Sequence, residues 1–514
     1  MPYFDFHLHP SLKPQLSQPP AIPSPWDIVK IKFNHPNVIT VLLKCSGINE
    51  VVDSQASLQQ LIKGKVNLVT IALHPPESNM MKDGLINEIA AEEQTQYINL
   101  QRVRDISSGD IYFRMLNEEL ANLKAHLSRQ GKKLKLIKKI SEYKANDLDT
   151  IHAVFSVEGP HAFHGARQGK TETEIMTEFW QNFETFTAAN RILSMNIAHL
   201  QDNLFCNHAF GIQIFKQEPF YPNGNGITHH GFRLLQKLKE KRILIDIKHT
   251  SLYARKQLYD YLLNDDDLPL VCTHAGLTGI EKTKRGIFFQ HQESEGDHLK
   301  IRHYKPAGYI GGTSFNPNSI NLYDEDVQQI LLSGGVTGII GLSLDQRILG
   351  VPDESMMGPD YFEDIYEEEV ISPQEKDYFT NVHTGTPDSH DIHEVSDMTL
   401  EVRQDYPIFH ARHFLNQVFH MFRIADKYSI NKALVAKRIC IGSDFDGLIN
   451  PVDCCQNVTQ YDSFKKLLLR NFGAWENEFA DVSGYRVSDF ISPADLLENI
   501  FYRNAVEFLQ TWYK

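Results

Sequence analysis

The sequence predicts an α/β fold, a (β/α)8 TIM-like barrel with large helical and loop insertions. Eight short apolar runs rich in Val and Ile recur along the 514 residues, and most are followed by a helix-like stretch. Continuous apolar runs are typical of parallel strands buried on both faces, and eight β-then-α units form such a barrel. The runs are Tyr3–His9, Val66–His74, Ile151–Glu158, Arg191–His199, Arg242–His249, Leu268–His274, Val336–Asp345 and Arg438–Asp444.

The second observation is chemical, because each of these runs ends in His, Glu or Asp. The carboxyl ends of barrel strands converge on one mouth, where enzymes of this fold keep their chemistry. Repeated ends of this kind predict a metal-binding or acid–base site at the mouth. Val38–Cys45 and Gly308–Phe315 are two further candidate strands.

The length is compatible with several average domains, but a single barrel domain over residues 1–514 fits as well. We expect three insertions in that domain. They are about 76–150, which is mostly helix-forming, 286–307, which is polar and rich in His and Glu, and 346–410, which is acidic.

The formal net charge of −14 argues against a nucleic-acid partner and against binding to an acidic membrane. No run approaches the length of a membrane span, and the first residues carry no basic and apolar signal-peptide pattern. Cys45, Cys272 and Cys440 lie in apolar runs and are expected to be reduced core residues. A cytoplasmic setting is therefore the expectation.

The opening strand carries His7 and His9 two residues apart, so both side chains share one face. Two neutral imidazoles on one face can bind one divalent metal, although a polar strand end would have the same pattern. Glu158 can bridge two metals through its two oxygens, or it can serve as a capping or ion-pair residue.

His249 and His274 end consecutive strands and should lie close together, as a second metal site requires. Lys248 is expected to point away from them, so we predict no modified-lysine bridge. Asp444, in Gly442–Gly447, is placed to take and pass on a proton, while Asp446 reads as a turn residue. His199 could bind a substrate carbonyl or be a structural histidine.

With these residues assembled, the chain resembles the membrane (renal) dipeptidase family of zinc metallopeptidases, a branch of the amidohydrolase superfamily. The resemblance rests on Val157-Glu158-Gly159, Asn196–His199, Gly226–His249, Thr273-His274 and Gly442–Gly447. It implies two divalent ions, Zn²⁺ by expectation. The implied roles are a first ion on His7, His9 and Glu158, a second on Glu158, His249 and His274, Asp444 as acid/base and His199 at the substrate carbonyl.

Three features depart from the family pattern. The first ligand pair is His-x-His where the family has His-x-Asp, and the insertions are large. The family's substrate-carboxylate arginine has no clear counterpart: Arg285 has a plausible spacing, whereas the local pattern places Ile320 there.

The predicted function is therefore hydrolysis of a small amide, with a dipeptide as the expected substrate and a hydroxide bridging two zinc ions as nucleophile. The alternatives are a phosphoesterase, an N-acyl amino acid hydrolase or a lactone hydrolase on the same barrel, or a binding protein without catalysis. The expected partner is the small-molecule substrate, with a homodimer as an open alternative.

Overall fold

The computed structural model describes residues 2–17, 22–30, 53–82, 98–211, 220–262, 268–332, 337–351, 368–380 and 406–514. Eight parallel strands form a nearly closed barrel in the order β1-β2-β5-β6-β7-β8-β11-β13, so all eight predicted strands are confirmed. Asp444 N donates to His7 O at 2.9 Å and His9 N to Phe445 O at 2.8 Å, which joins the last strand to the first. The strands are β1 Tyr3–Leu8, β2 Val66–Leu73, β5 Thr150–Val157, β6 Ile192–Asn196, β7 Leu244–Asp246, β8 Leu270–Ala275, β11 Ile339–Leu342 and β13 Ile439–Ile441.

The barrel interior is a packed apolar core, because every strand contributes a buried side chain to one cluster. The helix α19 (Asn504–Trp512) closes the end of the barrel away from the mouth with Phe508 and Leu509 from the same cluster. The inward-facing strand residues are Phe4, Phe6, Leu68, Val154, Leu193, Leu244, Val271, Ile339 and Cys440. A core filled in this way leaves only the carboxyl ends of the strands for chemistry.

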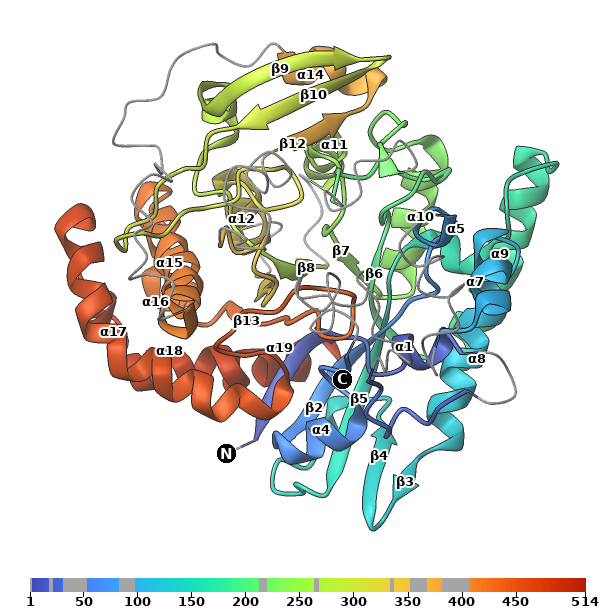
Figure 1. Ribbon diagram of the computed structural model, residues 1–514, viewed down its shortest axis with the longest axis horizontal. Helices are drawn as coiled ribbons and strands as arrows, with labels where there is room; N and C mark the ends of the chain where they lie inside the picture. The colour runs from blue at the N-terminus through green and yellow to red at the C-terminus, as the bar shows by residue number, and fades with distance from the viewer. Residues whose placement is uncertain are drawn as a thin grey trace, which may run out of the picture.

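Helices surround the barrel, with α15–α18 covering one side in Figure 1 and α7–α10 the other. Several of them start with a side-chain cap that accepts from a backbone N–H, for example Thr171 before α9 and Thr228 before α10. The helices are α1 Leu12–Gln15, α4 Leu58–Lys63, α5 Ser78–Lys82, α7 Leu100–Ser107, α8 Tyr112–Ala125, α9 Glu172–Ala189, α10 His229–Glu240, α11 Leu252–Leu262, α12 Asp324–Leu332, α14 Lys376–Thr380, α15 Tyr406–Lys427, α16 Lys432–Val435, α17 Tyr461–Ser483 and α18 Pro493–Glu498.

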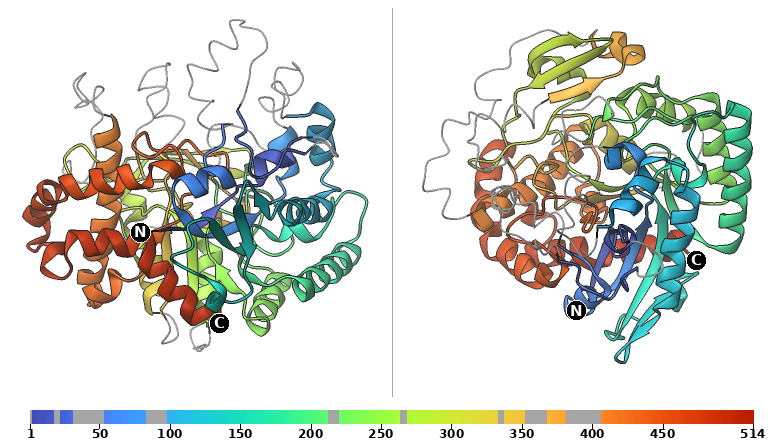
Figure 2. Two further views of the ribbon diagram at one scale, coloured as in Figure 1. Left: turned by 90° about the horizontal axis from the view of Figure 1, so that it is seen from below. Right: turned by 45° about the vertical axis from the view of Figure 1, so that its right-hand side comes forward.

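The segment 76–150 contains α5, α7 and α8, and also a short hairpin of β3 (Ser128–Arg129) and β4 (Lys132–Leu136). The segment 286–307 forms the hairpin β9 (Phe289–Glu295) and β10 (His298–His303). β12 (Glu368–Ile371) completes an antiparallel three-stranded sheet with that hairpin, which stands apart from the barrel at the top of Figure 1 and in the right-hand view of Figure 2. Most of 346–410 lies outside the described residues.

The sequence also predicts two further strands, Gly308–Phe315 and Val38–Cys45. Gly308–Phe315 is not a strand: its residues form bends and turns, with one isolated bridge between Ala307 and Ser314. Val38–Cys45 lies outside the described residues.

Cys272 and Cys440 are buried and free, as expected. Among the described helices, none is both long and apolar enough to cross a bilayer.

Candidate metal centre

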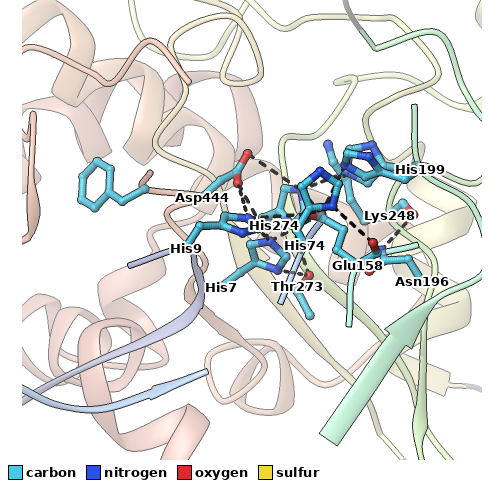
Figure 3. Close-up of polar contacts among 12 residues, drawn as sticks. His7, His9, His74, Glu158, Asn196, His199, Lys248, Thr273, His274 and Asp444 are labelled. Atoms are coloured by element: carbon cyan, nitrogen blue, oxygen red, sulfur yellow. Dashed lines mark hydrogen bonds and ion pairs between the residues drawn. The ribbon is translucent and has the colours of Figure 1, made fainter. Parts of the chain in front are cut away.

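Four histidines converge on the carboxylate of Glu158 at the barrel mouth (Figure 3). His7 Nε2 and His9 Nε2 are 3.0 Å apart, and His249 Nε2 and His274 Nε2 are 3.2 Å apart. Glu158 Oε2 lies 3.4 Å from His9 Nε2, while Oε1 lies 3.3 Å from His249 Nε2 and 3.6 Å from His274 Nε2. His7 Nε2 lies 3.5 Å from Oε1, so the five predicted ligand residues meet around one carboxylate, with three imidazoles near Oε1 and one near Oε2.

The opposite ring nitrogen of His7 is held by a buried hydrogen-bond chain. Thr273 Oγ1 donates to the carboxylate of Asp246, so it accepts the Nδ1–H of His7 at 2.9 Å. This assigns the tautomer of His7 and leaves its Nε2 lone pair facing Glu158. Carboxylate-to-histidine chains of this kind fix the ring of a metal-ligating histidine.

Asp5 joins the first and last strands below the site. It accepts from Ser443 N at 3.0 Å and from the hydroxyl groups of Ser443 and Tyr461. Burial raises the pKa of Asp5 to about 6, against the effect of these donors. The contacts fix the position of β13, whose end carries Asp444.

Two of the converging residues have backbone conformations that side chains rarely adopt. φ is +66° at His249 and +63° at Asp444, in the left-handed region. Such conformations cost about 1–3 kcal/mol and concentrate at functional sites. β7 ends at Asp246, so the turn at His249 re-aims its ring toward Glu158 after the strand has finished.

The charge states of the cluster suit a cation. Burial lowers the pKa of His249 and His274 well below the ordinary value, with neighbouring cationic groups acting in the same direction. Burial disfavours the charged form of Glu158 too, but the surrounding imidazoles, His199 and His7 first, hold its pKa well below the ordinary range. Burial opposes the charged form of His7 as well, but Glu158 raises the pKa of His7, so a metal ion would have to displace a proton there. With that proton released, imidazoles around an ionised carboxylate form the donor set that zinc and similar metals prefer.

Asp444 lies on the solvent side of the cluster. Its side chain is 17% exposed, against 3% for Glu158, and its Oδ1 is 3.3 Å from His9 Nε2. Asp446 faces elsewhere: it accepts from Gln55 N at 2.7 Å and Ala56 N at 2.9 Å, and pairs with Lys13 at 2.8 Å. Asp444 is thus the aspartate available to a molecule in the mouth, while Asp446 holds neighbouring loops.

His199 lies across Glu158 from His9 in Figure 3, with its Nε2 3.6 Å from Glu158 Oε1. Its Nδ1 is bonded to the carboxylate of Glu77, which also accepts from Leu200 N at 3.2 Å. Glu77 therefore fixes the ring of His199 with Nε2 directed to the centre of the mouth.

Sequence reasoning missed the network behind His199. Glu77 is fully buried and lies between His199 and His74, whose Nε2 is 3.2 Å from Glu77 Oε2. His161 forms a compact group with His74 and Glu77, in which one ligand atom of each residue lies within 4.8 Å of the others. The signal for His74 is present in the sequence, because it ends the second predicted strand. Glu77 lies in a loop and His161 in a short 3-10 helix, Pro160–Phe163, and neither is marked by a periodic pattern.

The sequence predicts that Lys248 points away from the histidine cluster, but in the structure its side chain lies close to it. Its side chain is buried and its Nζ donates to Ile320 O at 3.3 Å, while its charge lowers the pKa of both His249 and His274. No carboxylate of the described residues lies within ion-pair distance of this ammonium group. The alternation of side chains along a strand does not predict the direction of Lys248, because β7 ends two residues earlier, at Asp246.

Arg285 is engaged away from the histidine cluster. Its guanidinium is buried, forms an ion pair with Glu369 of β12, and donates through Nε to Tyr323 Oη at 2.8 Å. Ile320 is buried in a small cluster with Ala209 and Ile348. Among the described residues, Arg285 therefore links the three-stranded β9–β10–β12 sheet to Tyr323.

No protein-family model and no curated protein sequence matches the chain. Among solved structures it is similar to a metallo peptidase from Rhodobacter sphaeroides liganded with a phosphinate mimic of the dipeptide L-Ala-D-Ala. The identity is 14%, the TM-score is 0.46, and the match covers 94% of this chain and 99% of that one. A second match, the metallo peptidase dipeptidase AC, has 13% identity, a TM-score of 0.44 and coverage of 95% and 100%. A third, the probable dipeptidase PvdM from Pseudomonas aeruginosa, has 12% identity, a TM-score of 0.43 and coverage of 90% and 89%. These three structures are described as metallopeptidases or dipeptidases, and a fourth match, with 10% identity and a TM-score of 0.41, is an amidohydrolase from Pseudomonas aeruginosa.

Proposed function

We propose that the protein is a metal-dependent hydrolase of small amides, with a dipeptide as substrate. The observation that carries this proposal is the convergence of four imidazole Nε2 atoms on both oxygens of Glu158. His7 and His9 approach each other to 3.0 Å and His249 and His274 to 3.2 Å, without an intervening donor group. Two facing lone pairs repel one another unless a proton or a metal ion lies between them.

The donor set fits two divalent ions. His7, His9 and Glu158 would hold one, and Glu158, His249 and His274 the other, with zinc expected and manganese, cobalt or iron compatible with the same ligands. Bound ions of this kind lower the pKa of water and polarise a carbonyl or phosphoryl oxygen.

Two residues of the chain itself would handle the proton and the carbonyl. The exposed edge of Asp444 reaches the mouth beside His9, where its carboxylate can accept a proton from water and pass it to a departing amine. His199 donates its Nδ1–H to Glu77, and with both ring nitrogens protonated it could also donate from Nε2 to the substrate oxygen as negative charge develops there.

The experiment that tests the proposal is a substrate panel with metal-loaded and chelated protein. We expect dipeptides to be hydrolysed, activity to disappear after chelation and dialysis, and activity to return with added Zn²⁺. Phosphate esters, N-acyl amino acids and lactones are the comparison substrates. Hydrolysis that survives complete metal removal, or a preference for phosphate esters, would contradict the proposal.

We infer that Lys248 favours substrates with a carboxylate beside the scissile amide. The buried ammonium group of Lys248 donates to the carbonyl of Ile320; an anion would stabilise its charge, and a dipeptide supplies one. Lys248→Met should lower the preference for a dipeptide over its carboxy-terminal amide by about 10- to 100-fold in kcat/KM, mainly through KM.

Arg285→Met is the matched control, because it removes a buried cation that is paired with Glu369. It should leave the preference for the carboxylate unchanged and lower the unfolding temperature. The inference about Lys248 is wrong if the two variants change the preference equally.

A further inference from the structure

The loop after β2 and the turn after β5 bring three potential ligands together behind His199. They are His74, Glu77 and His161, all buried, with one ligand atom of each within 4.8 Å of the others. None of the three belongs to the two ions assigned above, and Glu77 reaches His199 from this group.

The outer nitrogens of both histidines are occupied by backbone carbonyls. His74 Nδ1 lies 3.3 Å from Glu158 O, and His161 Nε2 lies 2.8 Å from Pro75 O. A carbonyl oxygen can only accept, so each of these nitrogens carries the proton. In the neutral rings, His74 Nε2 and His161 Nδ1 then present lone pairs to the group they form with Glu77.

Glu77 adds a third acceptor to the same place. Its Oε1 accepts from His199 and from Leu200 N, but its Oε2 is buried and receives no hydrogen bond from any described residue. His74 Nε2 approaches Oε2 to 3.2 Å without hydrogen-bond geometry. A buried carboxylate oxygen left without a donor is costly. Burial opposes the charged form of His74, but Glu77 raises the pKa of His74 to about 9, so either a proton on His74 or a bound cation can supply the positive charge.

The surroundings hold this group rigidly. Pro75 and Pro76 limit the backbone of the loop, and Ser78 N donates to Tyr112 Oη at 2.7 Å. The ring of Tyr112 packs edge-on against His161 at 5.1 Å between centroids. Preorganised ligands with their outer nitrogens bonded to carbonyls are typical of metal-binding histidines.

We propose that His74, Glu77 and His161 form a third divalent-cation site, separate from the pair on Glu158. Two imidazoles and one carboxylate suit a first-row transition ion such as Zn²⁺, Co²⁺ or Fe²⁺. The cation holds Glu77 in place, and through Glu77 it fixes the orientation of His199.

The test is metal stoichiometry of the full chain after loading with Co²⁺ and desalting. The wild type should retain one ion more than Glu77→Gln and one more than His161→Asn, while both variants keep the ions on Glu158. Equal metal content in all three proteins would overturn the proposal and would mean that a proton on His74 balances Glu77.

Anomalous diffraction from cobalt-loaded wild-type crystals tests the same site without a variant. A peak about 2.0–2.2 Å from Glu77 Oε2 and from the facing nitrogens of His74 and His161 supports the proposal, and an empty position overturns it. Peaks on Glu158 report separately on the proposed hydrolase centre, so either site can fail alone.

Discussion

Glu158→Ala removes most of the bound metal and lowers kcat for a dipeptide by at least about 10³-fold. Glu158 is the group that approaches both imidazole pairs, with Oε2 3.4 Å from His9 and Oε1 3.3 Å from His249. Without it, each pair keeps two neutral ligands and no negative charge. The measurement is metal content of the purified variant together with its turnover.

Glu119→Gln is a matched control for this loss. Glu119 is another buried glutamate near the mouth, and it accepts from Ser11 Oγ at 2.6 Å and from His74 N at 3.0 Å. Burial raises its pKa to about 7, so a neutral amide resembles a form that it already samples. This variant should keep the two central ions; Glu158→Ala with undiminished metal would contradict the assignment.

Asp444→Asn should lower kcat by about 10²- to 10⁴-fold and leave the metal content unchanged, because an amide cannot take up and return the proton. The carboxylate is the most exposed of the acidic groups around the cluster, which gives it access to water and to the leaving amine. Steady-state kinetics with metal analysis of the same samples separates the proton role from ligation.

The control lies two residues further along the chain. Asp446→Asn loses part of its interaction with Lys13 and with the backbone of Gln55 and Ala56. It should lower the unfolding temperature and reduce kcat much less than Asp444→Asn does. Loss of an ion from Asp444→Asn would instead make Asp444 a ligand, since its Oδ1 is 3.3 Å from His9 Nε2.

The barrel could be predicted because its strands carry their signal locally. Each strand is a continuous apolar run, and the barrel geometry alone brings the ends of distant runs together. His7 and His274 are far apart in sequence, yet their ring centroids lie 3.9 Å apart. Four of the five proposed ligands thus lie in or directly after a strand, whereas His249 lies in the turn three residues after the end of β7.

The rest of the site depends on loops, whose course local periodicity does not record. Glu77 lies beyond a Pro-Pro turn, and His161 follows Gly159, whose φ is +88°. Lys248 was misplaced because alternation was extended past the end of β7 at Asp246. The β9–β10 hairpin lies in a segment that composition marks only as polar, because β9 is mostly exposed, although β10 alternates the buried Leu299 and Ile301 with polar residues.

The most direct measurement of the central claim is the position of metal in crystals of the zinc-loaded protein. If two metal ions share Glu158, two anomalous peaks are expected about 3.5–4 Å apart. One should lie between His7, His9 and Glu158, and the other between Glu158, His249 and His274. Absence of both peaks at saturating Zn²⁺, with these side chains well ordered, would contradict it.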